Sequence, residues 1–91
     1  LAEYEAAAVW YAERSSVAAL SFTVLIDAAI DAVCELPDAW PFWSGRSDVR
    51  RRVVQRVPYS IIYLVQDDAI IIVAVAHDKR RPGYWLRRVR R

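Results

Sequence analysis

The chain has 91 residues, which is enough for one domain and too few for two. Its 56% apolar content supports a core and excludes intrinsic disorder. The single cysteine, Cys34, excludes an intramolecular disulfide and is typical of a reducing cytoplasm, where we expect the protein to act. The longest apolar run, 69–76, is too short to cross a membrane, and the acidic N-terminus does not resemble a signal peptide. We therefore expect no membrane association, and no cofactor or metal site is predicted.

A net charge of +2 hides a strong separation of charge along the chain. Residues 1–45 carry a net charge of −6, and residues 46–91 carry +8. Such asymmetry within one domain favours an acidic partner or a nucleic acid facing the basic half. The plain alternative is a solvated basic face without a ligand.

The first part of the chain, 1–36, predicts an antiparallel helical hairpin. The first helix is expected over 1–14, and the Ser15-Ser16 pair breaks it and offers a cap for the second. The second helix is expected to run to about Leu36, where Pro37 ends it. Its apolar stripe is Ala18, Phe22, Leu25, Ile26, Ala29 and Val33.

A turn-rich connector, 37–48, leads into a predicted three-stranded meander over 49–77. In the first strand Val49, Val53 and Val57 are expected to be buried, with a cationic face opposite them formed by Arg50, Arg52 and Arg56. Strands are expected at 59–66 and 69–76, joined by a turn at Asp67-Asp68, and the last strand is expected to be central because both of its faces are apolar.

The remaining segment, 78–91, is expected to be a basic tail or a short terminal element. The pattern as a whole predicts one α+β domain, 1–91, in which the helical hairpin packs on a small antiparallel sheet. The chain contains no Met and begins inside a predicted helix, so we expect a further first strand before Leu1.

The stretch Ala-Val-Ala-His-Asp-Lys-Arg-Arg-Pro-Gly-Tyr-Trp, residues 74–85, turns from apolar strand to charged surface within a few residues. Such a transition is typical of a functional edge. Plainer roles are available: His77 bonded to a neighbouring backbone carbonyl at a strand end, and Tyr84 and Trp85 pinning the tail onto the sheet.

Several motifs in this order resemble the RelE/ParE family of bacterial type II toxins. They are Ala-Val-Trp-Tyr-Ala-Glu-Arg-Ser at 8–15, the Trp-Pro connector, the basic strand, Pro-Tyr-Ser-Ile-Ile-Tyr at 58–63 and the 74–85 ending. The resemblance implies a helical hairpin on an antiparallel sheet, with a first strand before Leu1. It also implies a toxin that a cognate ParD- or RelB-like antitoxin neutralises.

The family resemblance implies two different modes of action. RelE-type members cleave mRNA on the ribosome, whereas ParE-type members poison DNA gyrase. The positions that match the RelE nuclease pattern carry Arg51, Val53, Ser60, Asp78 and Tyr84, of which the tyrosine alone is retained. Arg is a poor general base, and Asp78 would repel phosphate. The resemblance therefore favours gyrase binding.

Two alternatives stay open. A rearranged mRNA endonuclease would use Arg51, Arg56, His77, Arg81 and Tyr84, with the histidine moving protons and the cations holding phosphate. A plain nucleic-acid-binding module would need no more than basic side chains, but the chain offers no recognition-helix motif.

The partner that the resemblance implies most firmly is an antitoxin with an acidic, amphipathic segment. We expect this segment to cross the cationic strand face. We also expect its affinity for the toxin to fall as the salt concentration rises. The predicted partner-binding residues are Arg50, Arg52, Arg56, Lys79, Arg80, Arg81, Tyr84 and Trp85.

Overall fold

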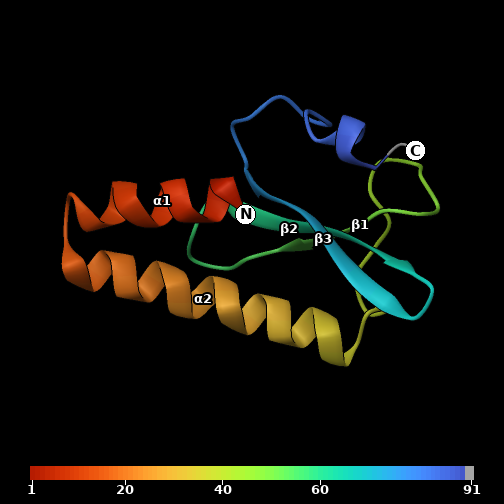
Figure 1. Cartoon of the computed structure of the whole chain (residues 1–91), viewed down its shortest axis with the longest axis horizontal. Helices are drawn as coiled ribbons and strands as arrows, with labels where there is room; N and C mark the ends of the chain where they lie inside the picture. Colours follow the sequence, from red (N-terminus) through yellow and green to blue (C-terminus); the bar gives the residue numbers. More distant parts are fainter. Residues whose placement is uncertain (90–91) are drawn as a thin grey trace.

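The computed structural model describes residues 1–89 and has two helices followed by three strands (Figure 1). The helices are α1 (Ala2–Ala12) and α2 (Ser16–Glu35). The strands are β1 (Arg50–Val53), β2 (Tyr59–Gln66) and β3 (Ala69–His77), and a 3₁₀-helix, η1 (Leu86–Arg88), lies near the C-terminus. The α+β class and the helical hairpin on an antiparallel sheet are confirmed. The strand expected before Leu1 stays a prediction.

The two helices form the predicted hairpin, because the chain breaks and restarts within three residues. Ser15 has an extended backbone, and its hydroxyl accepts a hydrogen bond from the Ala18 amide at 3.2 Å. This side-chain cap satisfies one of the free amides at the start of α2. The buried residues of α2 are Phe22, Ile26, Ala29 and Val33, four members of the predicted stripe.

The sheet is an antiparallel meander in the order β1-β2-β3, so β2 is the central strand. The prediction that the third strand is central is therefore wrong: among the described residues, β3 pairs on one side alone. β3 is apolar on both faces for another reason. The helical hairpin covers one face of the sheet, and the folded C-terminal segment covers the other.

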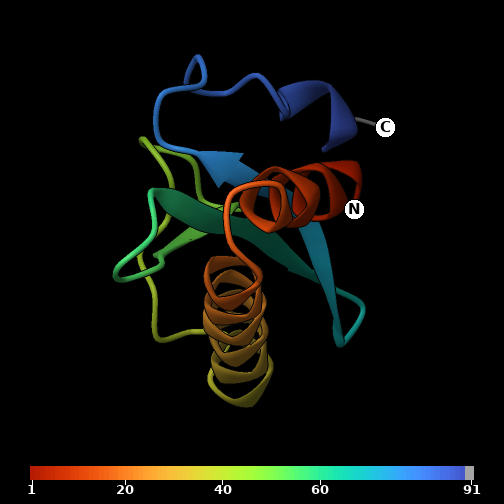
Figure 2. The same ribbon diagram turned by 90° about the vertical axis from the view of Figure 1, so that its left-hand side faces the viewer.

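Two hydrophobic cores lie on opposite sides of the sheet. Neighbouring residues of β2 alternate between them: Ile61 and Tyr63 pack with the helices, and Ile62 packs with the C-terminal segment. In Figure 2 this appears as three layers, with α2 below the sheet and the C-terminal segment above it. Trp85 and Val89 are buried in the upper layer, with Tyr84 and Leu86 packed against them, so residues 84–89 are packed on the sheet, whereas residues 78–82 are exposed. Arg90 and Arg91, the end of the predicted tail, lie outside the described residues.

The faces predicted for β1 are wrong for the arginines and for Val53, although Val49 is buried as predicted and Val57 is partly buried. Antiparallel partners share a face of the sheet, and Arg50 pairs with Tyr63 and Arg52 with Ile61, which belong to the core under the helices. Val53 lies on the other face and is 49% exposed, while Val54, just past the strand, is buried. The arginine pair points inward at the sheet edge because connector aromatics cover it, which period-two alternation could not reveal.

By length and composition, α2 is apolar enough to cross a membrane, a test that core helices of soluble proteins also pass. In this fold one side of α2 forms the core, and the rest of its surface is exposed.

Replacing Phe22 tests the packing of the hairpin on the sheet. Its ring is 1% exposed and lies 5.0 Å from the Tyr11 ring and 5.2 Å from the Tyr59 ring, measured between centroids. We expect Phe22→Ala to lower the free energy of unfolding by roughly 3–5 kcal/mol, measured by urea unfolding. Should that variant fail to fold, Phe22→Leu is expected to cost less than about 1.5 kcal/mol. Val17→Ala, on the exposed side of α2, is the control, and equal losses at both positions would contradict this packing.

Candidate partner-binding groove and the basic residues around it

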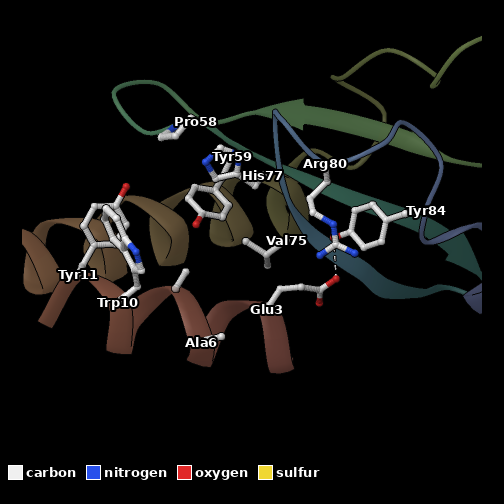
Figure 3. A pocket seen from close by; sticks show the side chains of 11 residues that line it. Glu3, Ala6, Trp10, Tyr11, Pro58, Tyr59, Val75, His77, Arg80 and Tyr84 are labelled. Carbon is white, nitrogen blue, oxygen red and sulfur yellow. Dashed lines mark hydrogen bonds between the residues drawn. The ribbon is translucent and has the colours of Figure 1, made fainter. Parts of the chain in front are cut away.

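An aromatic groove of about 480 Å³ lies between α1 and the end of β3 (Figure 3). The α1 wall is formed by Glu3, Ala6, Ala7, Trp10 and Tyr11. The opposite wall is formed by Pro58, Tyr59, Val75, His77, Arg80 and Tyr84. Small alanines in the middle of α1 leave room between the two walls. A mostly apolar cleft with a few polar groups is typical of a binding site.

One end of the groove is closed by a hydrogen-bonded link between the two ends of the chain. The Tyr84 hydroxyl donates to Glu3 Oε2 at 2.7 Å, and Arg88 Nη1 binds the same oxygen at 2.6 Å. Arg88 also donates to the Val73 carbonyl of β3. Glu3 therefore fixes the C-terminal segment against α1 and holds the Tyr84 ring in the groove wall.

Burial of Tyr84, and then its hydrogen bond to Glu3, raises the pKa of its phenol to about 12. Burial disfavours the charged phenolate, and ionisation would also place a second negative charge beside Glu3, so both effects favour the protonated hydroxyl. Tyr84 thus acts here as a hydrogen-bond donor within the fold.

His77 lies in the groove wall beside Tyr59, with its ring edge toward the Tyr59 ring at 4.9 Å between centroids. Its Nδ1 accepts a hydrogen bond from the Lys79 amide at 3.0 Å. The backbone bond expected for His77 therefore exists, but with an N–H donor in place of a carbonyl acceptor. This hydrogen bond engages the lone pair of Nδ1.

A second, smaller hollow of about 100 Å³ lies on the other side of Tyr84, and it gathers four of the five predicted nuclease residues: Arg51, His77, Arg81 and Tyr84. Arg56 does not line it; this residue sits in the β1–β2 connection with a positive φ of 76°. Arg51 Nε donates to Ser60 Oγ at 3.1 Å, and its Nη2 lies 3.9 Å from an Asp78 carboxylate oxygen. Of the three arginines that line this hollow, Arg51 is thus already paired with an acid, whereas Arg80 and Arg81 form no ion pair with other described residues.

Arg50 and Arg52, predicted to bind a partner, are held by the connector. Arg50 donates to the Trp40 carbonyl at 2.6 Å, lies 3.5 Å from the Asp38 carboxylate and stacks 3.9 Å over the Phe42 ring. Arg52 lies 4.5 Å over the Trp40 ring. The Arg50 guanidinium is thus hydrogen-bonded, paired and stacked, whereas Arg52 stacks on Trp40 and its buried Nε has no hydrogen-bond partner among the described residues.

Among the other predicted partner-binding residues, those of the loop 79–81 are exposed and Trp85 is buried. Lys79, Arg80 and Arg81 are exposed and form no ion pair with other described residues. Arg80 stacks 3.9 Å over the Tyr84 ring at the mouth of the groove. Trp85 is 2% exposed and packs edge-on against Trp43, so the tail-pinning role is the one its position fits.

The groove contains residues that sequence reasoning missed. Glu3 and Trp10 carried no signal, because one looks like an ordinary acid of a first helical turn and the other like an aromatic of a helix face. Pro58 and Tyr59 gave no sign of a groove either, because a proline beside a strand and an aromatic within a strand are common structural features. Their convergence depends on how α1 crosses the sheet, which no local pattern encodes.

The fold and these surfaces define a small α+β domain with an apolar groove that has a basic mouth, next to a smaller hollow in which Arg51 is paired with Asp78. The chain belongs to the family described as ParE toxin of type II toxin–antitoxin system, parDE, whose model matches residues 1–82. It is therefore the toxin component of such a system, and a cognate antitoxin is its partner. No curated protein and no solved structure matches the chain.

The raised pKa of Tyr84 predicts a loss of stability at alkaline pH. Because the pKa of Tyr84 in the folded state, about 12, exceeds the ordinary tyrosine value of 10.0, the folded state keeps a proton that the unfolded state releases. The stabilisation is complete below about pH 10 and is lost as pH rises toward 12. We expect urea midpoints to fall over this range and to fall less in Tyr84→Phe. An unchanged alkaline slope in this variant would contradict the buried hydrogen bond to Glu3.

Proposed function

We propose that this toxin acts by binding and poisoning DNA gyrase, in the bacterial cytoplasm, and that it does not cleave RNA. The observation that carries the proposal is that residues lining the second hollow are already engaged by other groups of the fold. Arg51, one of the hollow's three arginines, contacts Asp78 and Ser60, and His77 Nδ1 accepts a hydrogen bond from the Lys79 amide. Membership of the ParE family and the reducing environment indicated by a single cysteine support the same function and location.

Cleavage of RNA at a 2′-hydroxyl needs a base, a cation for the phosphorane and an acid for the leaving oxygen. His77 Nδ1 already accepts a hydrogen bond from the Lys79 amide, and the Tyr84 hydroxyl donates to Glu3. The Asp78 carboxylate beside Arg51 opposes a second anion at the same place. The second candidate, an mRNA endonuclease, is favoured by one observation: Arg51, His77, Arg81 and Tyr84 do meet around one hollow.

An assay with purified gyrase and plasmid separates the two candidates. We expect the toxin to block supercoiling and to leave linear plasmid from trapped cleavage complexes, and His77→Ala to keep this activity. In cells, induction is expected to trigger the DNA-damage response while primer extension shows intact mRNA. Codon-position-specific cleavage of mRNA that His77→Ala abolishes would establish the nuclease and overturn the gyrase proposal.

We further propose that the antitoxin's acidic, amphipathic segment binds in the aromatic groove and not across the face of β1. The apolar walls fit hydrophobic side chains, and Arg80 at the mouth, in the exposed basic loop 79–81, fits a carboxylate. The cations of β1 that were expected to serve this purpose are occupied by the connector.

Two substitutions test the groove as the antitoxin site. We expect Trp10→Ala to weaken binding by about 2 kcal/mol or more, because an aromatic anchor is lost from a cleft. Arg80→Glu should raise Kd roughly tenfold and reduce the salt dependence of binding. Arg87→Glu, an exposed charge reversal on η1, is the control. Calorimetry that finds the control and Arg80→Glu equally impaired would contradict this site.

A further inference from the structure

The outward face of α2 carries exposed aliphatic side chains. Val17 is 72% exposed, Leu20 is 66% exposed and Val24 is 57% exposed. Their spacing of three and four residues places them on one line along the helix, opposite the buried stripe that contains Phe22 and Ile26. The first half of α2 is thus apolar on both sides, although this fold covers one side alone (Figure 2).

The same line becomes acidic toward the end of α2. Asp31 and Glu35 follow Val24 at seven and eleven residues, which returns them to the same face, and both are exposed. No Lys or Arg occurs in α2, and neither acid forms an ion pair with another described residue. Asp27, at the flank, differs because it accepts a hydrogen bond from the Tyr4 hydroxyl.

This aliphatic–acidic stripe (Val17, Leu20, Val24, Asp31 and Glu35) is separate from the aromatic groove, since no residue of α2 lines that groove. Its charge is also opposite to that of the loop 79–81. A ligand suited to the groove would be repelled by the acidic end of the stripe.

We propose that the aliphatic–acidic stripe is a docking surface for a helix of a partner protein, amphipathic and carrying Lys or Arg at one end. Aliphatic residues of such a helix would cover Val17, Leu20 and Val24 in ridges-into-grooves contact. Its cations would meet Asp31 and Glu35, which fixes the direction in which the helix lies. The proposal does not depend on gyrase as the target.

Two other occupants fit the charges less well. A second copy of the chain would bring its own acids beside Asp31 and Glu35 in a parallel pairing. An antiparallel pairing of the aliphatic residues would leave these acids without partners. An anionic membrane surface would repel the acids at the end of the stripe.

The test uses two synthetic helical peptides of about 20 residues with the same leucine seam, one with lysines and one with glutamates after it. With ¹⁵N-labelled protein, we expect the lysine peptide to shift amide resonances of α2 and the glutamate peptide to bind roughly tenfold more weakly or not at all. The Leu20→Gln/Val24→Gln variant should lose binding of the lysine peptide. Val9→Gln, on the similarly exposed Val9 of α1, is the matched control and should keep it.

Charge reversal keeps the proposal open to refutation. Asp31→Lys/Glu35→Lys is expected to exchange the preference between the two peptides. Equal binding of both peptides, binding that Leu20→Gln/Val24→Gln leaves intact, or no shift in α2 would overturn the proposal. Binding of the protein to phosphatidylglycerol vesicles through α2, or dimerisation in sedimentation equilibrium that Leu20→Gln abolishes, would assign the stripe to one of the other occupants.

Discussion

The burial of β2 on both faces is the constraint on which the rest of this structure depends. A strand with apolar residues in both directions cannot lie under a single layer, so the hairpin and the C-terminal segment must each supply a cover. Phe22 and Ile26 provide the first, and Trp85 and Val89 provide the second. Because the two covers meet beside β3, the aromatic groove arises where α1 and the C-terminal segment approach each other.

Glu3 joins these two covers. Through Tyr84 and Arg88 it links the first turn of α1 to residues more than eighty positions away. Its side chain is 14% exposed, so the carboxylate is well shielded and its two partners satisfy it. The same residue therefore stabilises the chain ends and defines one end of the groove, which couples the stability of the domain to the shape of its candidate binding surface.

Local patterns predicted the elements of this fold well. The Ser15 cap, the stop at Pro37 and the Asp67-Asp68 turn all rest on short-range chemistry, and both aspartates of the turn have the positive φ that a tight hairpin needs. The order of the strands was not predictable in this way, because an apolar strand looks the same at the centre of a sheet and at an edge covered by other elements. The face of β1 was misjudged for a related reason: Trp40 and Phe42 accept guanidinium groups by stacking, so arginine is not a marker of solvent there.

This reassignment of the arginines changes what the charge separation along the chain means. Of the cations in the basic half, Arg46, Arg50, Arg51 and Arg88 are each paired with an acid inside the fold. Among the described residues, Arg80 supplies the positive charge at the groove mouth, and neither Arg80 nor its neighbours Lys79 and Arg81 have such a partner. The acids of α2 lie in the layer on the opposite side of the sheet from the C-terminal segment (Figure 2). A bipolar sequence has therefore folded into two surfaces of opposite charge, each beside exposed apolar side chains. Two such surfaces favour two partners of different chemistry over one partner that binds by charge alone.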